Sequence, residues 1–199
     1  RKMKKKAMIF IDGSNVFYDW KNSAGPGRNM DVHRFLDCVK NKFSDIDVIR
    51  TYYFISESEQ NKNFLQSINK IPYFEVITGR LQQKPITITE RYGLVCPECG
   101  KEVTGQVMTM TDKGTDVNIA VEMIRHAYEH SYEKAILISR DADFSGVVKI
   151  IKSLGMNVEL VLFEGAQTKA QELSAEVDNV VVLHSDDYAE CEMLYSGEY

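Results

Sequence analysis

The stretch KAMIFIDGSNV (residues 6–16) decides the fold. Its apolar part, residues 7–11, has the length of a buried strand, and Asp12 follows directly, at the carboxyl end of that strand. In a parallel α/β sheet the carboxyl ends of the strands line one edge, and ligands bind in the crevice there. Asp12 is therefore the first candidate for a functional residue.

Outward from this strand, short β-branched or aromatic runs alternate with stretches of helical period, which is typical of a parallel sheet covered by helices. We predict strands at residues 7–11, 48–55, 73–78, 135–139, 158–163 and 180–183. We predict helices at residues 30–43, 57–69, 117–128, 144–154 and 168–176. Gly79 should end the third strand, and Gly155 should cap the helix at 144–154. The fold class is α/β, with a mostly parallel central sheet of five or six strands flanked by helices.

Residues 80–113 break this alternation, because they contain Pro85, Gly93 and the string CPECG (residues 96–100). We interpret them as an insertion, either a β-hairpin or an irregular flap over the sheet edge. The expected organisation is a single domain over residues 1–183, followed by a solvated acidic tail over residues 184–199.

Three stretches distant in sequence bring carboxylates to one sheet edge. Asp141 and Asp143 follow the strand at 135–139, and Asp116 opens a helix. Carboxylates this close repel one another, and a hard divalent cation such as Mg²⁺ or Mn²⁺ removes the repulsion. Such an ion can activate water and hold a phosphate, which favours phosphodiester hydrolysis. The alternative is that each aspartate is a helix N-cap, Asp143 above all; the spacing alone leaves both interpretations open.

Three motifs add a family resemblance. FIDGSNV (residues 10–16) resembles the opening motif of the NYN domains, the LabA-like branch of the PIN-type nuclease superfamily. KGTDV (residues 113–117) is similar to the second motif of that family, and LISRDADF (residues 137–144) to its third. The resemblance covers residues 6–183. It implies a Rossmann-like PIN fold and Mg²⁺- or Mn²⁺-dependent, endonucleolytic cleavage of RNA.

The resemblance also assigns roles to the motif residues. The implied metal ligands are Asp12, Asp116 and Asp141, with Asp143 as a further ligand or a partner of one. Asn15 and Ser139 would be polar support that orients a carboxylate or a phosphate.

The chain departs from the family pattern at two positions. Many relatives carry a further Asp on the helix after the second motif, where this chain has Val121 and Glu122. Glu122 could replace it, but an exposed helix residue is the favoured interpretation. Arg140 stands where a small residue is common, and it could bind a substrate phosphate or neutralise the aspartates. Lys113 is either a phosphate contact or a surface charge.

Cys96 and Cys99 have the spacing of one zinc knuckle, but a structural Zn²⁺ needs four ligands. No second CxxC follows, and His126 and His130 show no ligand spacing with the cysteines. Three interpretations stay open: a vestigial turn of free thiols, which is favoured; a site completed elsewhere in the chain; or a zinc shared between two subunits. A two-fold axis would double one CxxC into a Cys₄ site. A homodimer is compatible with the family but does not follow from the sequence.

The remaining aromatic, histidine and cysteine side chains give weaker signals. Trp20 is a candidate for stacking on a base, whereas core packing is favoured for Phe17. Cys38 is predicted to pack in the core. The four histidines are expected at the surface: His33, His126, His130 and His184.

Composition sets limits on function. The hydrophobic and charged fractions, 44% and 27%, are those of a soluble globular protein. No apolar run approaches the ~18 residues that cross a bilayer, so no membrane role is expected. Four cysteines are too few for a secreted disulfide scaffold, so we expect a cytoplasmic protein. The net charge of −5 argues against general coating of nucleic acid, but an acidic metal site is compatible with it.

The leading hypothesis is a single-domain ribonuclease whose partner is RNA. The alternative is a catalytically weak or inactive PIN-like module that binds RNA or protein, which Glu122 and the negative charge support. A third hypothesis, a phosphatase or phosphoacceptor with Asp12 as nucleophile, fits the motifs less well.

Overall fold

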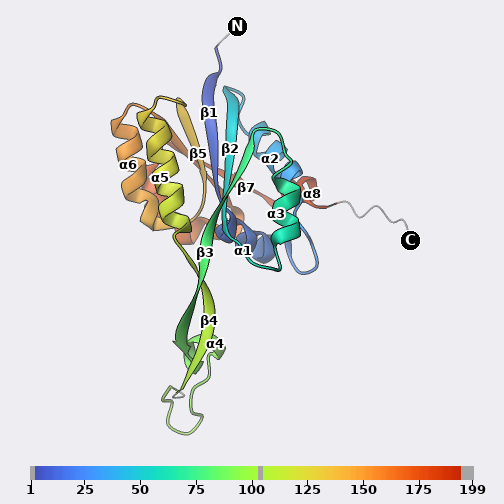
Figure 1. The fold of residues 1–199 in the computed structure, drawn as a ribbon, viewed down its shortest axis with the longest axis vertical. Coiled ribbons are helices and arrows are strands. Elements are labelled where there is room, and N and C mark those ends of the chain that lie inside the picture. Colours follow the sequence, from blue (N-terminus) through green and yellow to red (C-terminus); the bar gives the residue numbers. More distant parts are fainter. Residues whose placement is uncertain (1–2, 103–104, 194–199) are drawn as a thin grey trace, which may run out of the picture.

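The computed structural model describes residues 3–102 and 105–193. Its frame is a seven-stranded sheet in the order β4-β3-β2-β1-β5-β6-β7, with β1 at the centre (Figure 1). The strands are β1 (Lys5–Asp12), β2 (Ile46–Ser56), β3 (Phe74–Thr87), β4 (Gln106–Lys113), β5 (Lys134–Ile138), β6 (Asn157–Phe163) and β7 (Asn179–Leu183). All neighbours pair in parallel except β3 and β4, which are antiparallel. The predicted α/β class is confirmed, with seven strands instead of five or six.

Helices cover both faces of the sheet because its central strands are apolar on both sides. The helical elements are α1 (Gly13–Ala24), α2 (Val32–Asn41), α3 (Lys62–Ile68), α4 (Ile88–Tyr92), α5 (Thr115–Tyr128), η1 (Ala142–Phe144), α6 (Ser145–Ser153), η2 (Glu164–Ala170), α7 (Gln171–Glu176) and α8 (Ser185–Cys191). Ile9 and Ile11 of β1 face the core under α1, α2, α3 and α8, whereas Met8 and Phe10 face the core under α5, α6 and α7. Successive side chains of β1 point to opposite faces of the sheet, so the core has two layers, one on each face.

An arm formed by β3, β4 and α4 projects from the sheet (Figure 1). The prediction that Gly79 ends the third strand is wrong. Gly79 pairs with Ser56 of β2, and β3 then runs on to Thr87 because β4 supplies an antiparallel partner, from Arg80 opposite Lys113 to Thr87 opposite Gln106. Of the two interpretations of residues 80–113, the hairpin is confirmed.

The end of the described chain packs onto the body, so the predicted solvated tail is wrong for residues 184–193. Tyr188 and Cys191 lie one turn apart on α8 and are both buried. Asp187 Oδ1 lies 2.6 Å from Lys42 Nζ, and Glu192 Oε2 lies 2.7 Å from Arg28 Nη2. The rest of the predicted tail, residues 194–199, lies outside the described residues.

Capping residues explain where two helices begin and end. Asp31 accepts hydrogen bonds from the backbone N–H groups of His33 (2.9 Å) and Arg34 (3.1 Å), so α2 begins at Val32. Gly155 follows the last turn of α6 with a φ of 84°, a conformation that favours glycine. Within the described residues, no helix is long and apolar enough to span a membrane.

Candidate active site

Asp12 is the buried centre of the carboxyl edge, with 1% of its surface exposed. Its Oδ1 accepts a hydrogen bond from the backbone N–H of Asn15 at 2.9 Å, and its Oδ2 accepts from Ser139 Oγ at 3.1 Å and from the Asn15 side-chain amide. Burial raises the pKa of Asp12 to about 6, although the hydrogen bonds from Asn15 and Ser139 lower it; the charge of Asp116 raises it further. Asn15 and Ser139 therefore hold the Asp12 carboxylate in position.

Two glycines make room for this edge. A Cβ at Gly13 would lie 2.6 Å from Tyr53 Cε1 and 2.7 Å from the Phe54 carbonyl oxygen, so α1 can start against β2 only with glycine there. Gly114 has a φ of 88° and lets the chain turn from β4 into α5, with Asp116 in the first turn of that helix.

Asp116 shares its electrostatic environment with the other predicted aspartates. Its pKa is raised, first by lost hydration and then by the negative charges of Asp141, Asp112 and Asp143. Asp12 is also coupled to Asp116. We define the acidic cluster as these five residues: Asp12, Asp112, Asp116, Asp141 and Asp143. The four predicted aspartates thus lie within electrostatic reach of Asp116 or are Asp116 itself, and Asp112 is a fifth member of this set.

The capping alternative is correct for Asp12 and Asp141 but wrong for Asp143, and also for Asp116, because the N-cap of α5 is Gly114. Asp12 caps α1, and Asp141 Oδ1 accepts from the backbone N–H of Asp143 at 3.0 Å and so caps η1. The following helix α6 begins at Ser145 without any side-chain cap, and Asp143 is exposed. The cap lies two residues earlier than predicted because η1 precedes α6.

Asp112 is the member that sequence reasoning missed. Its Oδ1 lies 2.6 Å from both Ser56 Oγ and Thr115 Oγ1, and its Oδ2 lies 3.4 Å from Ser14 Oγ. Gly79 packs so closely that a Cβ there would lie 3.1 Å from Asp112 Oδ1. Asp112 belongs to the segment interpreted as an insertion, and its only signal was its place directly before the second motif.

Comparison with models of known protein families places the chain in one of them. A model of the NYN domain matches residues 6–184, nearly the whole chain.

The chain belongs to the NYN domain family.

NYN domains are part of the PIN-like nuclease superfamily. A crystal structure of a protein of unknown function from Vibrio parahaemolyticus resembles this NYN domain with a TM-score of 0.63 and 20% identity, over 97% of this chain and 99% of that one. At that identity the likeness shows the fold alone. None of the curated proteins compared with the chain matches it.

The donor set of this NYN domain fits a hard divalent cation, because the acidic cluster offers carboxylate oxygens. Within residues 3–102 and 105–193, no three His, Cys, Asp or Glu side chains already form a metal-binding group. A looser set still suits Mg²⁺, which keeps several waters and is often held by one or two carboxylates together with substrate phosphates. A cation would also offset the lost hydration and the repulsion that raise the pKa of Asp12 and Asp116.

Arg140 is held in an ion pair, whereas Lys113 is exposed to solvent. The Arg140 guanidinium is paired with Asp19 of α1 and lies 3.5 Å from the Asn15 carbonyl oxygen, so it neutralises a carboxylate outside the acidic cluster. Lys113 is exposed at the end of β4. Glu122 is paired with Arg125 within α5 instead of joining the acidic cluster. Its side chain is only 19% exposed, so the prediction of an exposed helix residue is wrong.

Three predictions about aromatic and histidine side chains are wrong. Trp20 is 3% exposed and donates its indole N–H to the Arg28 carbonyl oxygen at 2.9 Å, so it cannot stack on a base. Phe17, predicted to pack in the core, is 51% exposed. His126, predicted at the surface, is buried with Nε2 2.7 Å from the Tyr52 hydroxyl. Cys38 is buried as predicted.

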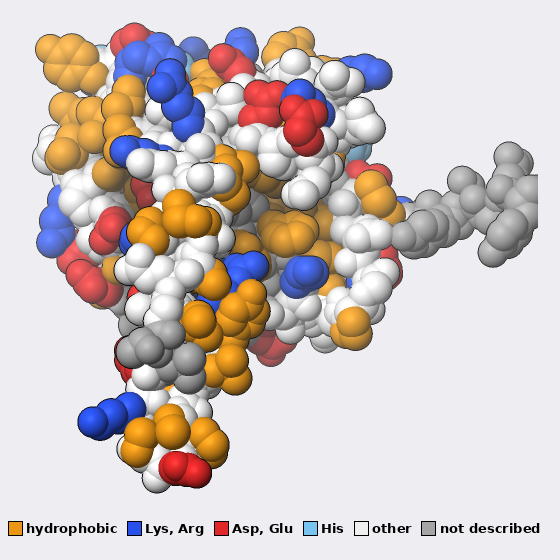
Figure 2. Space-filling view, turned by 60° about the horizontal axis from the view of Figure 1, so that its bottom comes forward, with side chains coloured by type: hydrophobic (Ala, Val, Ile, Leu, Met, Phe, Trp, Pro, Cys, Tyr) orange, Lys and Arg blue, Asp and Glu red, His pale blue; other side chains and the backbone are white. Residues whose placement is uncertain are grey.

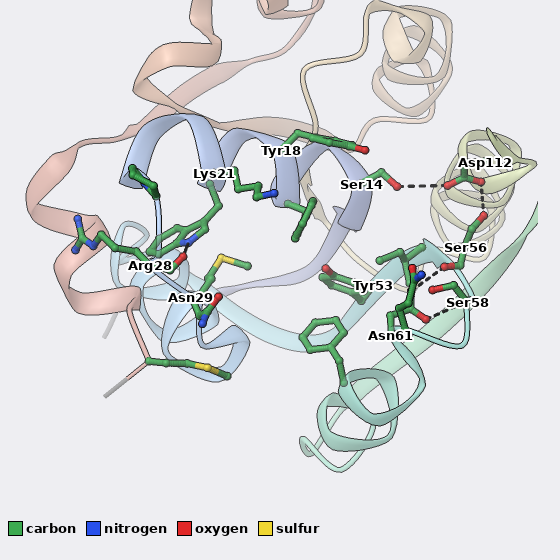
Figure 3. Close-up of a pocket in the computed structure, with 18 of the residues that line it drawn as sticks. Ser14, Tyr18, Lys21, Arg28, Asn29, Tyr53, Ser56, Ser58, Asn61 and Asp112 are labelled. Atoms are coloured by element: carbon green, nitrogen blue, oxygen red, sulfur yellow. Dashed lines mark hydrogen bonds between the residues drawn. The ribbon is translucent and has the colours of Figure 1, made fainter. Parts of the chain in front are cut away.

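A groove of about 820 Å³ leads from the acidic cluster across α1 (Figure 3). Asp112 and Ser14 lie at one end and Arg28 at the other, with Tyr18 and Lys21 of α1 along one wall. The opposite wall is formed by residues from β2 and from the segment before α3: Tyr53, Ser56, Ser58 and Asn61. Phe64 of α3 also lines the groove. Figure 2 looks onto this end of the molecule and shows hydrophobic side chains with basic ones among them beside the arm.

Proposed function

We propose that this NYN domain is a divalent-metal-dependent ribonuclease, acting endonucleolytically on RNA. The observation that carries the proposal is the convergence of Asp12, Asp116 and Asp141 from three separate segments on the carboxyl edge of the sheet. Asp12 is a buried carboxylate with a raised pKa that is held in place by Asn15 and Ser139, and such perturbed groups concentrate at functional sites.

Each residue of the cluster has a role in this proposal. Asp12, Asp116 and Asp141 would hold Mg²⁺ or Mn²⁺, with Asp143 as a further ligand or a partner. When bound, such an ion lowers the pKa of water and offsets charge on the phosphate. Asn15 and Ser139 fix the orientation of the Asp12 carboxylate. Lys113 is a candidate contact for the substrate phosphate.

The groove supplies a path for a single strand. Tyr18 is 58% exposed and Phe17 51% exposed, and Lys21 Nζ lies 5.3 Å from the centroid of the Phe17 ring. Exposed aromatic rings beside a basic side chain form a surface on which bases can stack while the cation faces the backbone. Phe17 and Tyr18 therefore replace Trp20 as the candidates for base stacking.

The test is cleavage of labelled RNA with Mg²⁺, with Mn²⁺ and with EDTA, for the wild type and for Asp12→Asn and Asp141→Asn. We expect metal-dependent cleavage that both variants lose and that Asp37→Asn, an exposed change on α2, retains. Circular dichroism and thermal unfolding establish that each variant is folded. Undiminished cleavage by both folded variants would refute the proposal.

A second candidate function is a module that binds RNA with little or no turnover. Two observations favour it: within the described residues no metal-binding group is already formed, and Glu122 is committed to Arg125. Binding of RNA that persists in EDTA, together with intact RNA after long incubation with Mn²⁺, would identify this function instead.

A further inference from the structure

The far end of the arm carries the CxxC turn, which the proposed function does not use. The Cys96 N–H donates to the Lys101 carbonyl oxygen at 2.8 Å, and the Gly100 N–H donates to the Cys96 carbonyl oxygen at 2.9 Å. Gly100 has a φ of 68°, and Val95 and Glu102 form an antiparallel bridge behind the turn. The backbone therefore folds into a tight knuckle around the two thiols.

Backbone N–H groups of the knuckle point at one sulfur. Hydrogen bonds from the N–H of Cys99 and of Glu98 lower the pKa of the Cys96 thiol. Soft metals bind cysteine sulfur, and the thiols of Cys96 and Cys99 lie within hydrogen-bonding contact of each other. Cys96 is half-exposed and Cys99 is exposed, and both are free thiols.

The rest of the described chain offers no ligands to complete this pair. Cys38 and Cys191 are buried against each other between α2 and α8. Within residues 3–102 and 105–193, no three His, Cys, Asp or Glu side chains form a metal-binding group. Because the arm carries the turn away from the body (Figure 1), the missing ligands have to come from another molecule.

The end of the arm also exposes apolar side chains. Three large apolar side chains close to the thiols are exposed, Tyr92 (63%), Leu94 (51%) and Val95 (50%), and a second arm would cover them. We propose that the arm ends of two copies bind one Zn²⁺ between them, through Cys96 and Cys99 of each copy. A two-fold axis through the ion gives the Cys₄ set of a closed, tetrahedral structural site. Binding releases the remaining thiol protons to solvent, with no change of oxidation state.

The first test measures metal content and mass on the whole chain, purified with Zn²⁺ and a phosphine reductant. We expect about one zinc per two chains by elemental analysis, and a dimer by light scattering that dissociates when a chelator removes the zinc. Zinc bound by a monomer, a dimer that persists without zinc, or a disulfide between the two cysteines would each overturn the proposal.

The second test uses variants of the exposed turn. The double variant Cys96→Ser, Cys99→Ser should be monomeric and zinc-free, whereas the matched change Lys101→Ala should keep both zinc and dimer. Replacing Zn²⁺ by Co²⁺ should give thiolate-to-cobalt charge transfer and the visible bands of tetrahedral cobalt in the wild type only. RNA cleavage is measured alongside; loss of cleavage bears on the acidic cluster, and loss of the cobalt spectrum bears on the arm.

Discussion

The carboxyl edge of the sheet and the end of the arm both gather potential metal ligands, but they do so in opposite ways. At the edge, Asp12 offers hard carboxylate oxygens that are buried and oriented by hydrogen bonds from Asn15 and Ser139. At the arm, Cys96 and Cys99 are soft ligands, accessible to solvent, positioned by one local turn. The tertiary fold gathers aspartates from distant segments, and their burial and mutual repulsion raise the pKa of Asp12 and Asp116. The local turn of the arm supplies two thiols, and a structural zinc site needs two more ligands.

The largest expected effect separates the two regions. Asp12→Asn should lower the rate of RNA cleavage by more than the ~10–100-fold typical of losing an outer partner of a metal ligand, and should leave zinc content and dimerisation unchanged. The double variant Cys96→Ser, Cys99→Ser should do the reverse. Cleavage assays and light scattering on both variants measure this, and if one variant abolished both properties the two regions would not be independent.

The second effect concerns how the buried carboxylate of Asp12 makes the free energy of unfolding depend on pH. The pKa of Asp12 is raised from 3.8 to about 6 in the folded state, so the stability it contributes is present below the unfolded value and is lost as the pH rises through about 6. In EDTA, the wild type should lose on the order of 2–3 kcal/mol relative to Asp12→Asn as the pH rises from about 4 to 7. Urea unfolding at each pH measures the difference. A pH-independent difference would contradict the burial of a titrating Asp12.

The third effect tests how the arm is joined to the edge. In Gly79→Ala, the new methyl group would meet Thr115 and Asp112, which should cost about 1–3 kcal/mol of stability. Gly146→Ala is the control, because Gly146 lies in α6 with open space around its Cα and alanine should stabilise that helix by about 0.5–1 kcal/mol. Urea unfolding compares the two. Equal stabilities would mean that the root of the arm repacks freely.

The smallest effect lies in the groove between the two regions. Phe17→Ala and Tyr18→Ala should each weaken binding of single-stranded RNA by about 1–3 kcal/mol, the range for one stacked base, with the lower end expected for rings this exposed. Tyr128→Ala, which removes a still more exposed aromatic ring on α5, serves as the control. Fluorescence anisotropy in EDTA with Asp12→Asn as the background avoids cleavage. Equal losses in all three variants would exclude a specific stacking surface.

Local patterns predicted most of the sheet but not its cross-strand partners. The run at residues 7–11 is apolar on both faces, so β1 and the position of Asp12 could be derived directly. The length of β3 could not, because its second half is held by β4 and lies outside the apolar pattern of the body. Asp112 reaches the acidic cluster only through that pairing, so no motif on its own segment revealed it.

Errors in the prediction of burial have a related cause. Trp20 and Phe17 lie three residues apart on α1, and only the helix orientation decides that the indole is covered by Tyr188 while the phenyl ring faces the groove. The acidic residues of α8 suggested a solvated tail, although Tyr188 and Cys191 form one apolar side of a short helix. The acidic residues on one side of α8 therefore suggested an exposed segment, although the other side of the helix packs onto the body.

The hydrogen bond from Ser139 to Asp12 joins residues 127 positions apart, and it has a consequence for the order of assembly. During synthesis β1 emerges first, yet it is the central strand and must wait for β5 before its second side is paired. The acidic edge therefore cannot exist on a nascent chain until most of the domain has left the ribosome. Placing the first strand in the middle of the sheet makes the site one of the last parts of the molecule to be completed.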